Sequence, residues 1–211
     1  AEQCFKNIQA VVESIGHDMN DIIRVSIFLA DIMDLNAVEK VQASFFPTYQ
    51  PARTVVAVDA LPQGALVFIE ALVDNGEGTQ SVPQAGDLVK LTNNTHAAPY
   101  DAGSTQTVAF SHYNNLSAQL PIDPATGAFP ATIEEQTRQS LENCKAVLAA
   151  AGAAMENVIK TTVFLSDMNN FAAMNGVYAT FFEGACPARS AVEVARLPKD
   201  ALVEIECIAV L

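Results

Sequence analysis

An arginine and a glutamate, two side chains that often act in binding and catalysis, each occur twice in this chain at the same spacing. Arg53 and Arg189 each follow Pro-Ala and precede a hydroxyl residue, and Glu70 and Glu206 follow them at equal distances. The planar guanidinium of Arg can pair a carboxylate through two hydrogen bonds and stays charged. A Glu carboxyl among apolar neighbours tends to have a raised pKa, which suits it to hold a water molecule and transfer protons. Together these groups suit acid–base chemistry on a small carboxylate.

Each of these residues also has a simpler interpretation, which the recurrence weakens. An Arg at a strand start most often forms a surface ion pair, but Arg189 is kept as Arg53 in the same Pro-Ala context. In the segment Val-Glu-Ile-Glu-Cys, we interpret Glu204 as a carboxylate on the solvent face, because Phe68 is at the matching position. Glu206 is matched by Glu70 and is therefore the predicted acid–base residue.

These pairs belong to a tandem repeat. Residues 1–75 and 137–211 align without a gap, and about 27 of the 75 pairs are identical, far more than chance gives. We call these ranges the first and the second copy. Residues 87–136 precede the second copy, and the first copy has no counterpart of them. The sequence predicts a partial domain at 1–75, a linker at 76–86 and a complete domain at 87–211.

The complete domain has the pattern of an α+β fold with the order β-β-β-α-β-α-β-β. Thr132 and Glu135 form a capping-box pattern at a helix start, and Gly152 can close that helix in the left-handed conformation. A second helix, capped by Asn169 or Asn170, follows the fourth strand. The expected strands are Asp87–Thr92, Thr105–Ser111, Tyr113–Ser117, Val158–Leu165, Ala188–Ala195 and Ala201–Val210.

The first copy should repeat only the last five elements of this order. They are a helix over about 1–14, strand Ile22–Leu29, helix Leu35–Phe46, and strands Arg53–Val58 and Ala65–Val73. Without the three preceding strands, this unit would expose a sheet edge and part of its core. We therefore expect strands from elsewhere to cover it.

Composition argues against several classes of protein. A net charge of -13 with 11 basic residues disfavours sequence-independent binding of nucleic acid. The cysteines at 4, 144, 186 and 207 do not recur between the copies and have no metal-ligand spacing, which predicts free thiols in a reducing, cytoplasmic compartment. No apolar run reaches the roughly 18 residues of a membrane span. The segment at Ala1 is not a signal peptide, and we expect it to lie inside a longer chain.

Longer motifs around the same residues resemble the RidA/YjgF family. They are IEEQTRQSLENCKAVLAAAG, VIKTTVFLSDMNNFAAMNGVYATFF, PARSAVEVARLPKDALVEIECIAV and, upstream, LSAQLPIDPATG. The resemblance covers 87–211 and, in its latter part, 1–75. It implies a chorismate-mutase-like α+β fold, usually trimeric, with clefts between neighbouring domains. It also implies hydrolysis of reactive 2-imino or enamine acids to 2-keto acids and ammonia. Some members carry an older label as endoribonucleases or translation inhibitors.

The resemblance assigns roles to matching residues of this chain. It implies that Arg189 binds the substrate carboxylate and that Glu206 positions water, with Arg53 and Glu70 as their counterparts in the first copy. Further cleft residues implied by the match are Asn175, Ser190, Ser117 and Ala118. Each cleft is expected to join a back half, with its Arg, Asn and Glu, to the front strands of a neighbour.

The chain departs from the family pattern at the front of the cleft. The family's cleft Tyr is replaced by Ser104. Tyr100 of the neighbouring loop is a candidate substitute, but a turn Tyr that packs on the surface is the preferred interpretation. The Gly of the family's Ser-Gly-Gln turn is Ala118, which narrows the backbone approach to a ligand. The Cys that usually follows the hydroxyl residue is Ala191. In the first copy, Glu39 replaces the Asn, so the Arg189 site is expected to be the more complete one.

Three functions remain open from these observations. The first is imine or enamine deamination without a cofactor, since no phosphate-binding loop, dinucleotide motif, Ser-His-Asp order or metal pattern is present. The second is a non-catalytic sensor or scaffold that binds small carboxylates. The third is a ribonuclease, which the acidic charge and the lack of a basic groove disfavour. The expected partners are small imino or keto acids and further copies of the chain in a trimeric or pseudo-hexameric packing, without nucleic acid or membrane.

Overall fold

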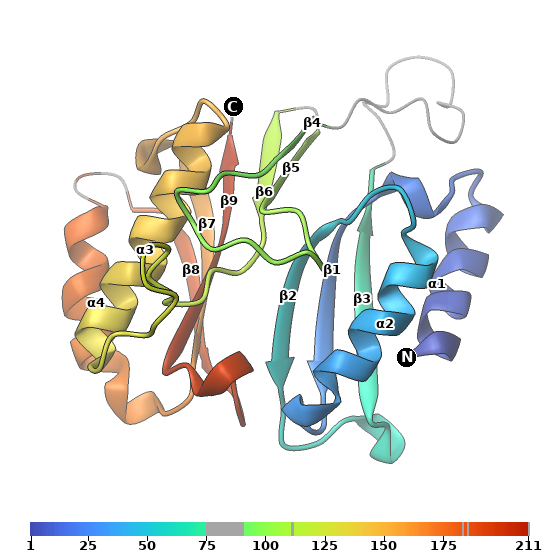
Figure 1. The fold of residues 1–211 in the computed structure, drawn as a ribbon, viewed down its shortest axis with the longest axis horizontal. Helices are drawn as coiled ribbons and strands as arrows, with labels where there is room; N and C mark the ends of the chain where they lie inside the picture. Colours follow the sequence, from blue (N-terminus) through green and yellow to red (C-terminus); the bar gives the residue numbers. More distant parts are fainter. Residues whose placement is uncertain (75–90, 111, 183, 185, 211) are drawn as a thin grey trace.

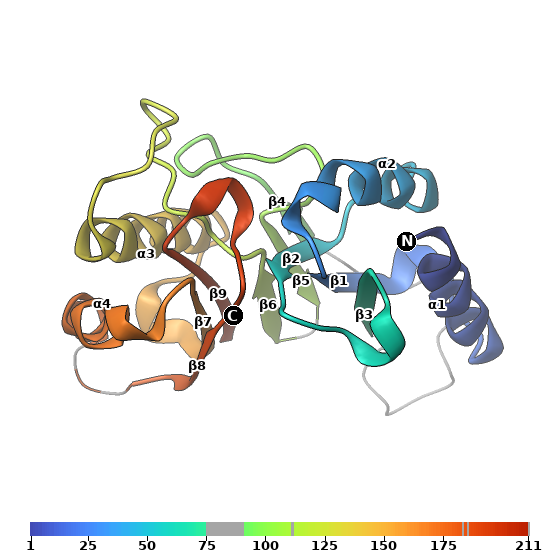
Figure 2. The same cartoon turned by 90° about the horizontal axis from the view of Figure 1, so that it is seen from below.

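The two copies build two helix-backed sheets that lie side by side (Figure 1). The structure is a computed structural model that describes residues 1–74, 91–110, 112–182, 184 and 186–210. We call residues 1–74 the N-terminal unit and the described residues from 91 onward the C-terminal unit. The helices lie on the outer sides of the molecule and the sheets face each other in the middle (Figures 1 and 2). The predicted linker at 76–86 lies outside the described residues, and the domain boundaries stay predictions.

The N-terminal unit contains the elements that the repeat predicts. They are α1 (Glu2–Ser14), β1 (Ile22–Leu29), α2 (Leu35–Phe45), β2 (Ala52–Ala57) and β3 (Val67–Val73). The strands form a sheet in the order β2-β1-β3, in which β1 and β2 are parallel and β1 and β3 are antiparallel. Apolar side chains of these strands pack under α1 and α2 in one cluster that includes Phe5, Ile27, Leu29, Val38 and Phe46. Burial of this apolar surface is the main stabilising term for the unit.

The C-terminal unit contains the same elements preceded by three short strands. These are β4 (Leu91–Asn93), β5 (Thr107–Phe110) and β6 (Tyr113–Leu116), which we call the front strands. They are followed by α3 (Ile133–Ala150), β7 (Val158–Leu165), α4 (Phe171–Tyr178), β8 (Ala188–Glu193) and β9 (Val203–Val210). The sheet order is β4-β5-β6-β9-β7-β8. The α+β, chorismate-mutase-like architecture predicted from the sequence is confirmed.

Local signals in the sequence fix several of these boundaries. Thr132 caps α3 through Glu135, with both hydrogen bonds of the capping box present, and Gly152 follows the helix with φ 80°. The second helix of this unit, α4, ends at Tyr178, and a 3₁₀ turn continues from there to Phe181. Asn170 lies at its N-cap without a side-chain capping bond.

Strands β1 and β7 show how closely the two units correspond. Arg24 lies opposite Ala52, and Lys160 lies opposite Ala188, so the parallel pairs share one register. The surroundings differ, however. Every residue of β2 is buried, whereas those of β8 are exposed or half-buried. The difference arises because the C-terminal unit covers β2, while β8 forms the far edge of its own sheet.

The front strands of the C-terminal unit cover the sheet of the N-terminal unit. The oxygen of Pro51 accepts a hydrogen bond from the Thr105 backbone N–H at 3.2 Å, and Ala57 N–H donates to the Arg196 oxygen at 2.9 Å. Two apolar clusters bridge the units, one with Ile23, Ala52 and Val108, the other with Val56, Phe164 and Leu197. The front strands thus cover the N-terminal sheet at β2, but they pair with β9 of their own sheet, and among the described residues β3 remains an edge strand. The expectation that other strands cover the exposed sheet edge of the first copy stays a prediction. In the described residues, no helix is long and apolar enough to cross a membrane.

A buried ion pair joins the units across this interface. Arg24 of β1 pairs with Glu206 of β9, and the Thr54 hydroxyl donates to the same carboxylate at 2.5 Å. The side chains of Arg24 and Glu206 are only 13% and 7% exposed. A charge buried to this degree depends on its partner, because desolvation of an unpaired carboxylate is costly.

We predict that Arg24→Met lowers the free energy of unfolding by about 3–5 kcal/mol, because Glu206 then remains buried without its counter-charge. Urea denaturation at pH 7 measures the change. Lys160→Met is the matched control at the equivalent, exposed position of β7 and should change stability by less than about 0.5 kcal/mol. Equal effects of the two substitutions would show that the ion pair does not stabilise the interface.

Candidate functional site

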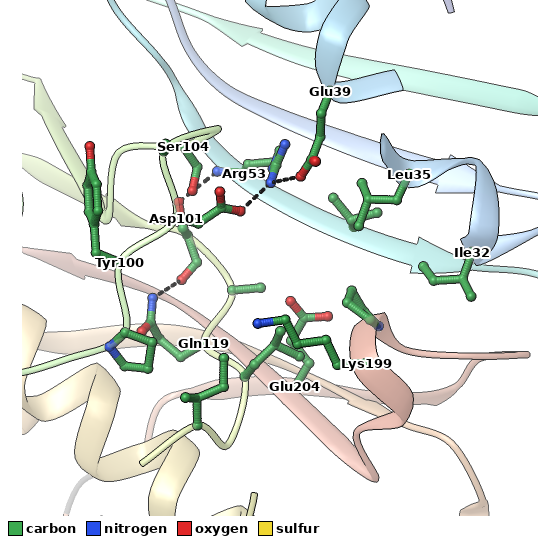
Figure 3. A pocket seen from close by; sticks show the side chains of 18 of the residues that line it. Ile32, Leu35, Glu39, Arg53, Tyr100, Asp101, Ser104, Gln119, Lys199 and Glu204 are labelled. Carbon is green, nitrogen blue, oxygen red and sulfur yellow. Dashed lines mark hydrogen bonds and ion pairs between the residues drawn. The ribbon is translucent and has the colours of Figure 1, made fainter. Parts of the chain in front are cut away.

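A cavity of about 600 Å³ lies between the two units. Figure 3 shows its lining, in which Arg53 and Glu39 of the N-terminal unit face Asp101, Gln119 and Glu204 of the C-terminal unit. One wall is polar, and the rest is largely apolar. The apolar lining comprises Ile32, Met33, Leu35, Val55, Pro99, Leu120, Ile122 and Pro198. A concave site with a few convergent polar groups is the usual form of a small-molecule site.

Arg53 reaches this cavity because the backbone of β2 is bonded to the front of the C-terminal unit. Its N–H donates to the Ser117 hydroxyl at 2.8 Å, and its carbonyl accepts from the Ala118 N–H at 3.0 Å. The Ser117 hydroxyl in turn donates to the Thr105 oxygen at 2.6 Å. Ser117 and Ala118 line the cavity as predicted. The Ser117 hydroxyl and the Ala118 N–H both join the units, so neither is placed to bind a ligand in this arrangement.

The guanidinium of Arg53 is surrounded by acceptors. Its Nη2 donates to Glu39 Oε1 at 2.8 Å and to Asp101 Oδ2 at 2.5 Å, and its Nη1 donates to Gln42 Oε1 at 3.3 Å. The side chain of Arg53 is 5% exposed. Glu39, which replaces the family's Asn in the first copy, is thus a partner of Arg53. The Arg53 guanidinium, which was predicted to bind a substrate carboxylate, already binds two carboxylates of the chain itself.

Glu204 is a further ionisable group of the cavity lining, which also contains Arg196, Lys199 and Asp200. The pKa of its carboxyl is raised to about 8, mainly by burial and then by the charge of Glu206, while Arg53 acts in the opposite direction. Its Oε2 is buried and has no hydrogen-bond partner among the described residues. Glu204 is part of the cavity lining, and a buried oxygen without a partner is free to accept a hydrogen bond from a water molecule or a ligand. The interpretation of Glu204 as a residue of the solvent face is therefore wrong, since it is 4% exposed.

Glu206 lies elsewhere, although it was the predicted acid–base residue. Its carboxylate is held by Arg24 and Thr54, and it is not part of the cavity lining. Its first-copy counterpart Glu70 is exposed on β3. The recurrence of this Glu therefore did not identify the residue that faces the cavity. Glu204 belongs to the C-terminal unit, which also contributes the front strands. The sequence instead predicted that the acid–base residue and the Arg of a cleft come from the same unit.

The predicted cluster around Arg189 lies on the outer edge of the C-terminal sheet. Arg189 is exposed on β8, and its guanidinium stacks over the rings of Tyr178 and Phe171 at 4.5 and 5.6 Å. Ser190 is exposed beside it, and Asn175 is half-buried on α4. None of the three lines the cavity between the units. Within this chain the front strands cover Arg53 and not Arg189, and the expectation that the Arg189 site is the more complete one stays a prediction.

The loop before β5 carries the remaining residues of interest. Tyr100 and Ser104 both line the cavity, so a Tyr does contribute to it from the neighbouring loop. Asp101 of the same loop was not identified from the sequence, because no pattern relates a loop carboxylate to an Arg in another unit. For Glu204, a signal existed: residues two apart on a strand share a face, so Glu204 and Glu206 were equal candidates. Among the described residues, no group of three His, Cys, Asp or Glu side chains is placed to hold a metal ion.

The fold and the motifs place this chain in a known family. Its sequence matches the family model described as Endoribonuclease L-PSP at residues 1–74 and 95–211. Similar proteins carry the names RutC, RidA and YjgF. The chain belongs to the endoribonuclease L-PSP family, which is the RidA/YjgF family that its motifs resemble. The matching of both ranges agrees with the tandem repeat.

Relatives and solved structures each correspond to a little over half of the chain. A RutC family protein of Pyrococcus horikoshii is 52% identical over 117 residues, which are 54% of this chain and 93% of that protein. The 2-iminobutanoate/2-iminopropanoate deaminase of Escherichia coli K12 is 48% identical over 124 residues, 56% of this chain and 94% of that protein. The crystal structure of the E. coli YjgF gene product has a TM-score of 0.56 at 47% identity, covering 57% of this chain and 98% of that chain. E. coli TdcF, solved with bound serine, has a TM-score of 0.55 at 46% identity, covering 56% of this chain and 96% of that chain.

We predict that ionisation of Glu204 destabilises the folded protein. In the unfolded chain this carboxyl ionises near 4.5, so between pH 4.5 and about 8 the folded state keeps a proton that the unfolded state has released. The free energy of unfolding therefore falls as pH rises through this window. The Glu204→Gln variant should exceed the wild type in stability by on the order of 4 kcal/mol near pH 9 and by little near pH 4. Urea denaturation of both proteins across this range measures the difference, and a pH-independent difference would contradict the assignment.

Proposed function

We propose that the protein hydrolyses reactive 2-imino and enamine acids to 2-keto acids and ammonia, at the cavity between Arg53 and Glu204. The observation that carries this proposal is the Glu204 carboxyl in the cavity lining, which has a raised pKa and a buried oxygen without a hydrogen-bond partner among the described residues. Similar proteins named 2-iminobutanoate/2-iminopropanoate deaminase support the same reaction class.

The pKa of Glu204 fits both proton transfers of such a hydrolysis. With a pKa of about 8, the carboxyl is mostly protonated near neutral pH and can donate its proton to the imine nitrogen. The protonated imine is a better electrophile, so water adds to its carbon. The carboxylate formed at Glu204 accepts a proton from that water, and this proton then passes to the nitrogen as the C–N bond breaks. As the C=O bond forms, the remaining hydroxyl proton returns to the Glu204 carboxylate, which restores its protonated form. Ammonia and the keto acid leave, and one water is consumed.

Arg53 can bind the substrate carboxylate, although Arg196 and Lys199 also line the cavity. A guanidinium holds a planar carboxylate in a defined orientation, which would direct the imine carbon toward the opposite wall, where Glu204 lies. The apolar lining can accept the substrate side chain. All steps use side chains of this chain and a water molecule.

A specific observation favours a second function, small-carboxylate binding without turnover. Ser104 occupies the position of the family's cleft Tyr, and Arg53 is paired with two carboxylates. Binding of 2-oxobutanoate without acceleration of imine hydrolysis would support this ligand-binding function.

We predict that Glu204→Gln lowers kcat by about 100-fold or more, because Gln can neither donate nor accept the proton. Arg53→Ala should raise KM strongly and lower kcat/KM. The assay follows 2-iminopropanoate generated in the cuvette by an amino-acid oxidase. Arg189→Ala is the matched control, an Arg in the same sequence context outside the cavity, and should leave the kinetics near those of the wild type. Loss of activity in Arg189→Ala alone would move the site to the edge of the C-terminal sheet.

We further propose that the protein assembles through β8 with a second copy of itself. The argument is the internal comparison: the equivalent strand β2 is fully buried by a neighbouring unit, whereas Arg189, Ser190 and Val192 are exposed. Val192 is 41% exposed on this strand. An edge strand with unpaired backbone groups is a natural place for such contact.

Light scattering after size exclusion should give a mass above that of one chain, consistent with the trimeric or pseudo-hexameric packing expected from the sequence. Val192→Asp should reduce that mass, because it introduces a charge at the proposed contact. Leu66→Asp is the control, at an exposed apolar position of the N-terminal unit. A monomeric wild type would contradict this proposal.

A further inference from the structure

The loop that carries Asp101 is shaped around the guanidinium of Arg53. Asp101 uses one carboxylate oxygen for Arg53 and the other to accept the Gly103 N–H at 2.8 Å. The Gly103 carbonyl accepts from the Gln42 side chain at 2.9 Å. A Cβ at Gly103 would lie 2.8 Å from Nη1 of Arg53 and 3.2 Å from its Cζ. A side chain at position 103 would therefore require the Arg53 guanidinium to move away from this loop.

The two carboxylates on Arg53 differ in how firmly they are held. Glu39 projects from α2 and its side chain is 30% exposed. Asp101 is on a loop at the cavity wall, and its side chain is 56% exposed. Both accept from the same nitrogen, Nη2. An entering carboxylate therefore meets Asp101 as the more accessible of the two competitors.

The charges around Arg53 disfavour a third carboxylate. Arg53 carries one positive charge, and Glu39 with Asp101 carry two negative ones, which leaves the cluster with a net negative charge. Like charges brought together in a partly desolvated site are strongly unfavourable. A substrate carboxylate would therefore bind Arg53 without strong electrostatic repulsion only when it replaces one of these side chains.

We infer that Asp101 is a specificity-determining residue that occupies the carboxylate-binding position on Arg53 and competes with the substrate for it. This inference rests on the proposed function and names the group that limits binding of anionic substrates at this cavity. Neutral ligands of the same shape do not need to displace Asp101. The wild-type cavity therefore discriminates against a carboxylate relative to its amide, and removal of the Asp101 charge reverses this preference.

The experiment compares two probes of equal shape, 2-oxobutanoate and its uncharged analogue 2-oxobutanamide, by calorimetry. The variant is Asp101→Asn, which removes the charge and keeps an oxygen that can accept the Gly103 N–H. It should bind 2-oxobutanoate roughly tenfold more tightly than the wild type, while binding of the amide changes less than about twofold. Asp101→Ser should give the same direction. Asp59→Asn, the same substitution at an exposed Asp that does not line the cavity, is the matched control and should change neither affinity.

A kinetic test separates this inference from the proposed reaction. In imine hydrolysis, Asp101→Asn should lower KM and leave kcat unchanged. If no variant hydrolyses imines but the calorimetric reversal occurs, the proposed function fails and the role of Asp101 stands. Weaker binding of 2-oxobutanoate by Asp101→Asn would show that Asp101 positions Arg53, and unchanged binding would show that it does not compete. Either result overturns the inference.

Discussion

The backbone contact between β2 and the segment Ser117–Ala118 is the constraint on which the cavity depends. Arg53 donates its N–H to one of these residues and accepts from the other. Because both groups are buried, leaving either unpaired would cost free energy. The pairing fixes Arg53 of the N-terminal unit against the front strands of the C-terminal unit. It thereby places an Arg and a Glu from different copies on the walls of one cavity.

The two copies have diverged around their arginines in ways that the structure makes chemically meaningful. Glu39 and Gln42 accept hydrogen bonds from Arg53. In the second copy, the position that matches Gln42 is Tyr178, and its ring stacks on Arg189. The position of Glu204 is Phe68 in the first copy, which is 44% exposed. One chain thus contains an enclosed Arg with charged partners and an open Arg with aromatic partners. Equivalent sites built from these two halves would have different affinities for anions.

Much of the fold followed from local patterns, and the site followed only in part. The capping box at Thr132, the β-branched run of β7 and the repeat itself predicted elements within one or two residues, because these signals act over short distances. Arg53 was among the predicted binding residues, and it does line the cavity. Glu206 was preferred over Glu204 because it recurs, yet alternation along a strand gives both residues the same face. Which of the two meets Arg24 and which meets the cavity depends on the partner unit.

The sequence by itself determined the repeat, the family, the order of the elements and the kinds of side chain available for chemistry. Those properties are carried by spacing and residue type, which a chain displays without folding. Only the tertiary structure decided that the front strands of the C-terminal unit cover Arg53 and that Arg189 lies on an open sheet edge. It also decided that Asp101 pairs with the guanidinium of Arg53. These are contacts between residues far apart in the chain. Their geometry depends on how two sheets pack against each other, and no local pattern encodes that packing.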